Sequence, residues 1–117
     1  MRREAEHREL YSGLIRLHVL YHAANQPIFG LQMIEELGRH RYRVSPGTLY
    51  PVLHGMEKRG LLTSARQGGP NGRRVYRATA EGRRALTTAR RRVRELFREL
   101  FEHVLEGPRS VQKRRLR

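Results

Sequence analysis

The 117-residue sequence contains no cysteine, no tryptophan and no aspartate. Without cysteine, the chain can form neither a disulfide framework nor a thiolate metal site, so we expect a reducing, cytoplasmic setting. Signatures of catalysis are also missing: the sequence has no Gly-rich phosphate loop, no Cys nucleophile and no G-x-S-x-G motif. These absences favour a binding protein over an enzyme.

Long apolar runs are absent as well. The first residues are charged and lead into no apolar core, and no apolar run approaches the length of a membrane span. We therefore expect neither an export signal nor a transmembrane segment.

Acidic residues are scarce relative to basic ones. Lys and Arg number 25 against 11 acidic residues, a net charge of +14. Such a balance indicates an anionic partner, chiefly nucleic acid. A chain of this length is expected to form one domain with a modest core, which a dimer interface would help to stabilise.

Residues 44–60 are predicted to form a short helix whose start and stop can be read from the sequence. Ser45 is a good N-cap, Pro46 suits the first helical position, and Gly60 is placed to end the helix. An apolar face is predicted from the spacing of Leu49, Leu53 and Met56. Pro51 falls inside this pattern, where it should kink the helix.

The outward side of this helix would carry Thr48, Tyr50 and His54, and the turn before it, residues 38–44, holds three arginines. A charge run is often only a solvated surface, but its position beside a helix with free N-terminal amides favours contact with phosphates and base edges. The residues predicted to contact DNA are Arg39, Arg41, Arg43, Ser45, Thr48, Tyr50, His54, Arg73 and Arg74. Arg73 and Arg74 belong to a predicted β-hairpin that follows the helix.

The segments on either side of this helix also have patterns that predict secondary structure. A helix is predicted from Glu9 to Ala24, which residues 1–12 could extend at the N-terminus, and another from Phe29 to Leu37. Residues 61–66 and 73–78 flank a run of turn formers and are predicted to form a β-hairpin with a flexible tip. The first helix is predicted to be mostly buried, with a stripe of Leu10, Leu14, Leu17 and Tyr21 that is widened by Ile15, Val19 and Leu20. In the second helix, Leu31, Ile34 and Leu37 are predicted to point one way.

A long final helix is predicted over residues 79–106, with Thr79 as its N-cap. Its apolar face is wider than one small domain can cover, which favours dimerisation, although the helix could also fold back on the first helix. A basic tail, residues 107–117, is predicted to be disordered. The predicted dimerisation residues are Leu86, Val93, Leu96, Phe97, Leu100 and Phe101.

His18 and His22 lie one helical turn apart and could share a divalent metal ion. Spacing reveals no third ligand, so structural roles for both histidines are the favoured interpretation.

Two motifs resemble a known family. Residues 45–62 read S-P-G-T-L-Y-P-V-L-H-G-M-E-K-R-G-L-L, and residues 72–82 read G-R-R-V-Y-R-A-T-A-E-G. The first is similar to the recognition-helix signature of PadR-family transcriptional regulators, and the second to the wing and exit of that family. The resemblance implies a homodimeric repressor that binds a palindromic site on double-stranded DNA. It also implies an effector, a small aromatic or drug-like molecule, in a cavity between the winged domain and the dimer helix.

The fold class expected from these observations is mainly α with a small β-hairpin: a winged helix-turn-helix followed by a long C-terminal dimerisation helix. The DNA-binding domain would span residues 1–78, the dimerisation helix 79–106 and the tail 107–117. Two alternatives stay open, a non-specific basic nucleic-acid-binding protein and a metal-sensing regulator that uses His18 and His22.

Overall fold

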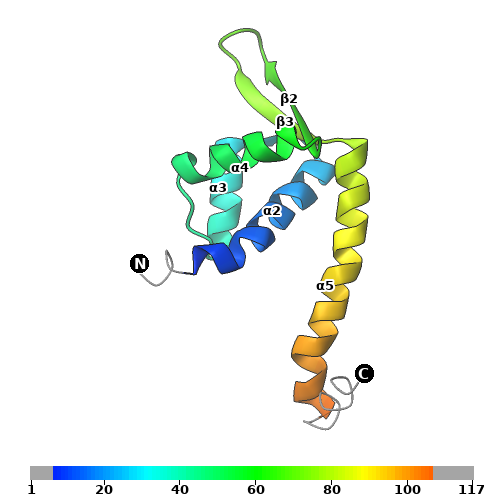
Figure 1. Cartoon of the computed structure of the whole chain (residues 1–117). Helices are drawn as coiled ribbons and strands as arrows, with labels where there is room; N and C mark the ends of the chain where they lie inside the picture. Colours follow the sequence, from blue (N-terminus) through cyan, green and yellow to red (C-terminus); the bar gives the residue numbers. More distant parts are fainter. Residues whose placement is uncertain (1–6, 107–117) are drawn as a thin grey trace. The chain divides into compact units, whose positions relative to one another are not determined.

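The computed structural model describes residues 7–106, with side chains as far as Glu102. The elements follow in the order α2, β1, α3, α4, β2, β3 and α5 (Figure 1). They divide into two compact units, one ending at Leu86 and the other beginning at Thr87. The predicted tail and the first six residues of the predicted N-terminal extension lie outside the described residues. Between residues 7 and 106, no helix is both long and apolar enough to cross a membrane.

Helix α2 (Arg8–Asn25) buries only part of the wide apolar surface that was predicted for it. Its buried residues are Ile15, Val19, Leu20 and Ala23. The predicted burial of Ile15, Val19 and Leu20 is therefore confirmed. Leu10 is 72% exposed, and Leu14 and Tyr21 are exposed as well, so the prediction was wrong for these three residues. The helix has apolar residues on two sides, and helical spacing alone cannot decide which side meets the core.

Strand β1 (Ile28–Phe29) precedes helix α3 (Gly30–Arg39) and was not predicted, because two residues are too few to leave an alternating pattern. The predicted helix began at Phe29, which instead pairs with the third strand. In α3, Met33 and Leu37 are buried while Leu31 is 60% exposed, so Leu31 does not share the buried face of Leu37 as predicted.

Helix α4 (Pro46–Lys58) begins and ends as its sequence predicts. The Ser45 Oγ accepts a hydrogen bond from the Thr48 N–H at 3.3 Å. Gly60 has a φ of 84° and follows the last turn, where its amide donates to the Glu57 carbonyl at 2.9 Å. This left-handed cap is the usual place for glycine after a helix. The predicted apolar face of α4 is confirmed, since Leu49, Leu53 and Met56 are all buried.

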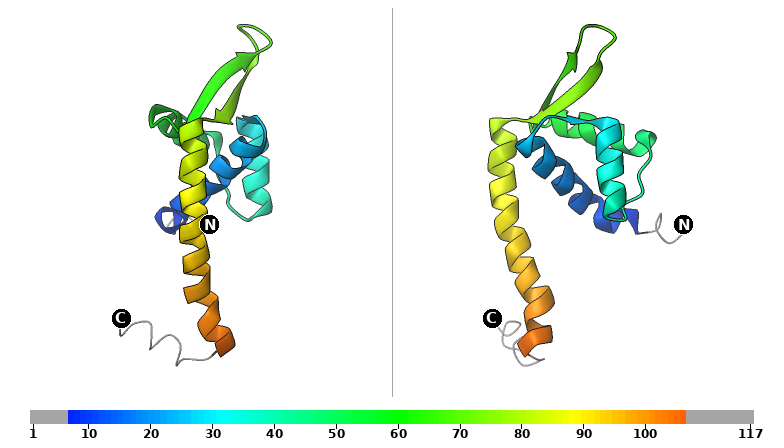
Figure 2. Two further views of the ribbon diagram at one scale, coloured as in Figure 1. Left: turned by 90° about the vertical axis from the view of Figure 1, so that its right-hand side faces the viewer. Right: turned by 180° about the vertical axis from the view of Figure 1, so that it is seen from behind.

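The sheet has three antiparallel strands in the order β1-β3-β2. Strands β2 (Leu62–Gln67) and β3 (Arg73–Ala78) form the predicted hairpin, which extends away from α2, α3 and α4 (Figures 1 and 2). Gly68 and Gly69 take positive φ values at its tip. The mainly helical fold with a small sheet is as predicted, and β1 adds a third strand to the hairpin.

Helix α5 (Ala80–Glu106) starts at the predicted cap. The Thr79 Oγ1 accepts the Gly82 N–H at 2.9 Å and donates to the Gly60 carbonyl, which joins the start of α5 to the end of α4. Leu86 is 8% exposed and belongs to the core of the first unit, so it is not available to a partner chain. The other predicted dimerisation residues are exposed: Val93, Leu96, Phe97, Leu100 and Phe101.

Candidate nucleic-acid interface

In the connection from α3 to α4, exposed arginines alternate with half-buried apolar residues. Tyr42 and Val44 are half-buried and pack against the core, whereas Arg41 and Arg43 are exposed. Arg39, at the end of α3, is exposed too, and its Nη1 lies 2.6 Å from Glu36 Oε1. The three predicted turn arginines are therefore all exposed, spaced along the connection from the end of α3 to α4.

Arg41 occupies a backbone conformation that is unusual for its residue type. Its φ is 71°, in the left-handed region. Its amide donates to the Gly38 carbonyl at 3.0 Å, and the Tyr42 amide donates to the Leu37 carbonyl at 2.9 Å. This is the helix-ending motif in which glycine is the common residue. An arginine in this conformation costs more free energy than a glycine would.

The predicted contact residues of α4 differ in their surroundings. Ser45 and His54 are exposed, and Thr48 is half-buried with its hydroxyl 3.3 Å from Ser45 Oγ. Tyr50 was expected to face outward, but it is half-buried against the core. A Cβ placed on Gly30 would lie 2.6 Å from Tyr50 Cζ, so the absence of a side chain at Gly30 makes room for this ring.

The wing arginines are exposed and held in place by the protein. The Arg73 guanidinium carbon lies 4.4 Å from the centroid of the Phe29 ring. Arg74 Nη1 donates to Ser64 Oγ at 3.0 Å, and Ser64 Oγ donates to Glu57 Oε2 at 2.8 Å. Both cations are thereby oriented on the hairpin, and both can still meet an external phosphate.

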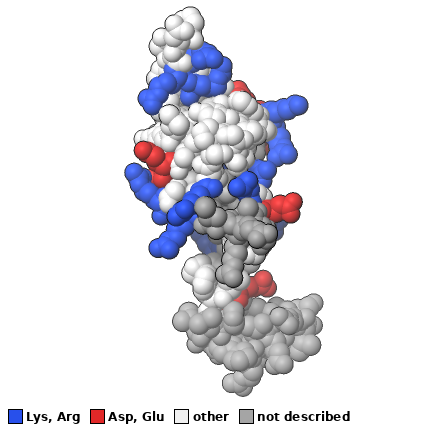
Figure 3. Space-filling view, turned by 90° about the vertical axis from the view of Figure 1, so that its left-hand side faces the viewer, with Lys and Arg blue, Asp and Glu red and all other residues white. Residues whose placement is uncertain are grey.

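The charge distribution on one face matches this arrangement. Figure 3 shows an uncharged area bordered mainly by Lys and Arg side chains, including those on the hairpin at the top of the view, with a few acidic side chains among them. A neutral centre with a cationic border suits base edges in a groove and phosphates on either side of it.

The two histidines considered for metal binding are engaged with α3 and its following turn. The His18 ring stacks on that of His40 with centroids 4.8 Å apart. His22 Nε2 and His40 Nε2 lie 3.6 Å and 3.4 Å from the same oxygen, Glu36 Oε2. Within the described part of the chain, no group of three or more His, Cys, Asp or Glu residues could hold a metal ion. The geometry accounts for both histidines as links between α2 and α3.

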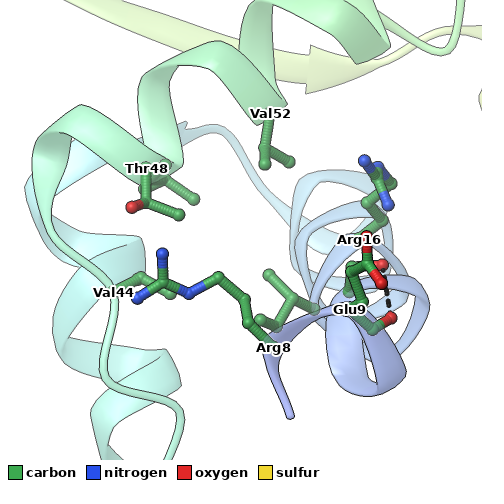
Figure 4. A pocket seen from close by; sticks show the side chains of 9 residues that line it. Arg8, Glu9, Arg16, Val44, Thr48 and Val52 are labelled. Carbon is green, nitrogen blue, oxygen red and sulfur yellow. Dashed lines mark hydrogen bonds between the residues drawn. The ribbon is translucent and has the colours of Figure 1, made fainter. Parts of the chain in front are cut away.

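Two further cations, Arg8 and Arg16, were missed by the sequence reasoning. They line a half-open pocket of about 650 Å³ between α2 and the first half of α4, together with Thr48 (Figure 4). Their sequence signal is the spacing of Arg8, Ser12 and Arg16, which places all three along one side of a helix.

Comparison with known proteins agrees with this geometry. Residues 19–88, more than half of the chain, match the PadR-like family of transcriptional regulators. The transcriptional regulator Rv3488 of Mycobacterium tuberculosis is 53% identical over 95 residues, which are 80% of this chain and 89% of that protein.

Solved structures of the same kind are also similar. A PadR-family transcriptional regulator from Eggerthella lenta has a TM-score of 0.71 at 30% identity, covering 88% of this chain and 91% of its own. A PadR-like transcriptional regulator from Bacillus cereus has a TM-score of 0.74 at 22% identity, covering 85% and 98%. By its sequence match and its fold, the chain belongs to the PadR-like family of transcriptional regulators.

Proposed function

We propose that this protein is a sequence-specific repressor that binds a palindromic operator as a homodimer. The observation that carries the proposal is the capped start of α4, with exposed arginines in the connection that precedes it and oriented arginines on the wing. A recognition helix of this kind reads base edges in the major groove, and its neighbours contact the backbone.

The contact residues that we propose divide by chemistry. Arg39, Arg41 and Arg43 would neutralise phosphates before the helix, and Arg73 and Arg74 would do so on the wing. Ser45, Thr48 and His54 would face the groove. Because Tyr50 is half-buried against the core, we propose that its main role is to pack α4 onto the core. Only the exposed edge of its ring would contact DNA.

Homodimerisation is proposed from the exposed apolar side chains of α5. Phe97 is 59% exposed and Leu96 50% exposed, and large apolar side chains rarely gather on a surface without a partner. Two copies would present two recognition helices to half-sites about one helical turn apart. Repression and a response to a small aromatic or drug-like effector are proposed from the family resemblance alone, and we infer a cytoplasmic setting from the absence of cysteine.

The test is a selection of binding sites from random duplexes, followed by affinity measurements for the selected site and for random DNA at one salt concentration. We expect a selected site with two-fold symmetry and a specificity ratio of about 10³ or more. A net charge of +14 favours one alternative, non-specific nucleic-acid binding, and a ratio near one would establish it in place of our proposal.

A further inference from the structure

We propose that the groove between α2 and the first half of α4 binds the sugar-phosphate backbone of DNA, with Arg8 and Arg16 as its phosphate contacts. This inference rests on the proposed function and adds α2 to an interface that otherwise consists of the turn, α4 and the wing.

The position of the groove is the first argument. Thr48, which belongs to the exposed first turn of α4, also lines the groove. In Figure 4 the Arg8 side chain extends from α2 toward Val44 and Thr48, across the opening. The groove is therefore continuous with the surface that would face DNA, and a backbone beside the recognition helix could enter it.

The chemistry of the lining is the second argument. The walls are apolar, from Ile15, Val44, Leu49 and Val52, while two arginines and the hydroxyls of Ser12 and Thr48 supply the polar groups. Deoxyribose carbons suit the apolar walls, and phosphate oxygens suit guanidinium and hydroxyl groups. The carboxylate of Glu9 also belongs to the lining, so the site is not uniformly cationic.

The availability of the two cations is the third argument. The ion pairs with arginine found among the described residues use Arg39, Arg84 and Arg92. Arg8 and Arg16 take part in none of them, so their charges are free to neutralise an external phosphate. Arg8 is exposed and Arg16 half-buried, which leaves both guanidinium groups within reach of the opening.

The experiment compares two charge-matched variants of the full chain, Arg8→Gln/Arg16→Gln and Arg84→Gln/Arg92→Gln. The control pair loses the same charge from α5, where each arginine already has a glutamate partner. Affinity for a duplex of random sequence is measured by fluorescence anisotropy over a range of salt concentrations. Each phosphate contact contributes about 0.9 to the slope of log affinity against log salt, so the groove variant should lose about 2 and the control none.

Two further variants guard against a folding defect. Arg8→Gln alone changes an exposed residue and should lower the slope by about 0.9. Arg8→Lys/Arg16→Lys keeps both charges and should retain most of the slope. Equal slopes for the groove and control variants would overturn the inference.

Failure of the proposed function is distinguishable from failure of this inference. If the wild-type protein does not prefer its selected site to random DNA, the proposal of specific operator binding is wrong. The slope measured on random DNA still decides whether the groove contacts the backbone.

Discussion

At the scale of single residues, Arg41 combines an unfavourable backbone conformation with a proposed role in DNA binding. A left-handed conformation costs a non-glycine residue about 1–2 kcal/mol, and nothing in the local backbone requires arginine there. Backbone strain of this kind is found where a side chain serves a function. The phosphate contact that we propose for the exposed Arg41 would be such a function.

We predict that Arg41→Gly makes the protein more stable and a weaker DNA binder. Glycine relieves the left-handed strain but loses backbone entropy on folding, so the free energy of unfolding should rise by up to about 1 kcal/mol. Urea denaturation and DNA titration measure the two effects separately. Arg41→Ala is the matched control, since it removes the charge and keeps the strain. Equal stability of the two variants would show that Arg41 is not strained.

A second prediction at this scale concerns Tyr76 in the wing. Its side chain is fully buried, and its hydroxyl has no hydrogen-bond partner among the described residues. A buried polar group without a partner costs about 1–3 kcal/mol. Tyr76→Phe removes only this oxygen, so the midpoint of thermal unfolding should stay the same or rise. A clear fall in the midpoint would reveal a partner for the hydroxyl.

At the scale of elements, α2 is tied to α3 and its following turn by a cluster of His18, His22, His40 and Glu36. Burial lowers the pKa of His18 below its ordinary 6.5, the charges of His40 and His22 lower it further, and Glu36 opposes them. For Glu36, burial raises the pKa, but His22, Arg39 and His40 outweigh burial and hold it below 4.5. The Tyr42 ring packs edge-on against His18, with centroids 5.4 Å apart.

This arrangement predicts that acidification weakens the junction between α2 and α3. The unfolded chain takes up a proton at His18 at a higher pH than the folded chain, so stability falls as pH drops below 6.5 toward the lowered pKa. The contribution of Glu36 is present above 4.5 and is lost only at lower pH. Protonation of His18 and protonation of Glu36 therefore both lower the free energy of unfolding.

Urea denaturation at a series of pH values tests this prediction by measuring the free energy of unfolding at each pH. His18→Phe keeps a ring that can stack on His40 but cannot titrate, so its stability should change less than that of the wild type just below pH 6.5. His54→Asn removes an exposed histidine of α4 as a control. A His18→Phe variant with the wild-type pH dependence would exclude His18 as the responsible group.

At the scale of the whole molecule, the exposed apolar side chains of α5 favour association of two chains. Burying one such side chain contributes about 1.5–3 kcal/mol, and burying a charge instead opposes association. We predict that Leu96→Glu/Leu100→Glu dissociates the proposed dimer at micromolar concentrations. Light scattering measures the mass, and Leu96→Met/Leu100→Met, which conserves volume, should leave it unchanged.

The same variant separates specific from non-specific DNA binding. A monomer would hold one half-site reader, so affinity for the selected operator should collapse while weak binding driven by the net charge of +14 survives. A dimer with intact operator affinity would show that α5 is not the dimerisation element.

The sequence alone determined the features that depend on a few neighbouring residues. The Ser45 cap, the left-handed Gly60, the Thr79 cap and the turn at Gly68 and Gly69 could all be predicted. Each is a hydrogen bond or a backbone conformation that spans only a few positions, so local residue types are enough to specify it.

Only the tertiary structure decided the features that join distant segments. It selected which apolar face of α2 is buried, paired β1 with β3 across more than forty residues and stacked His18 on His40. It also seated Tyr50 beside Gly30 and placed Arg8 across from Thr48. The physical reason is that such contacts follow from how whole elements pack, and helical spacing assigns a residue to a side of its helix without saying what that side will meet.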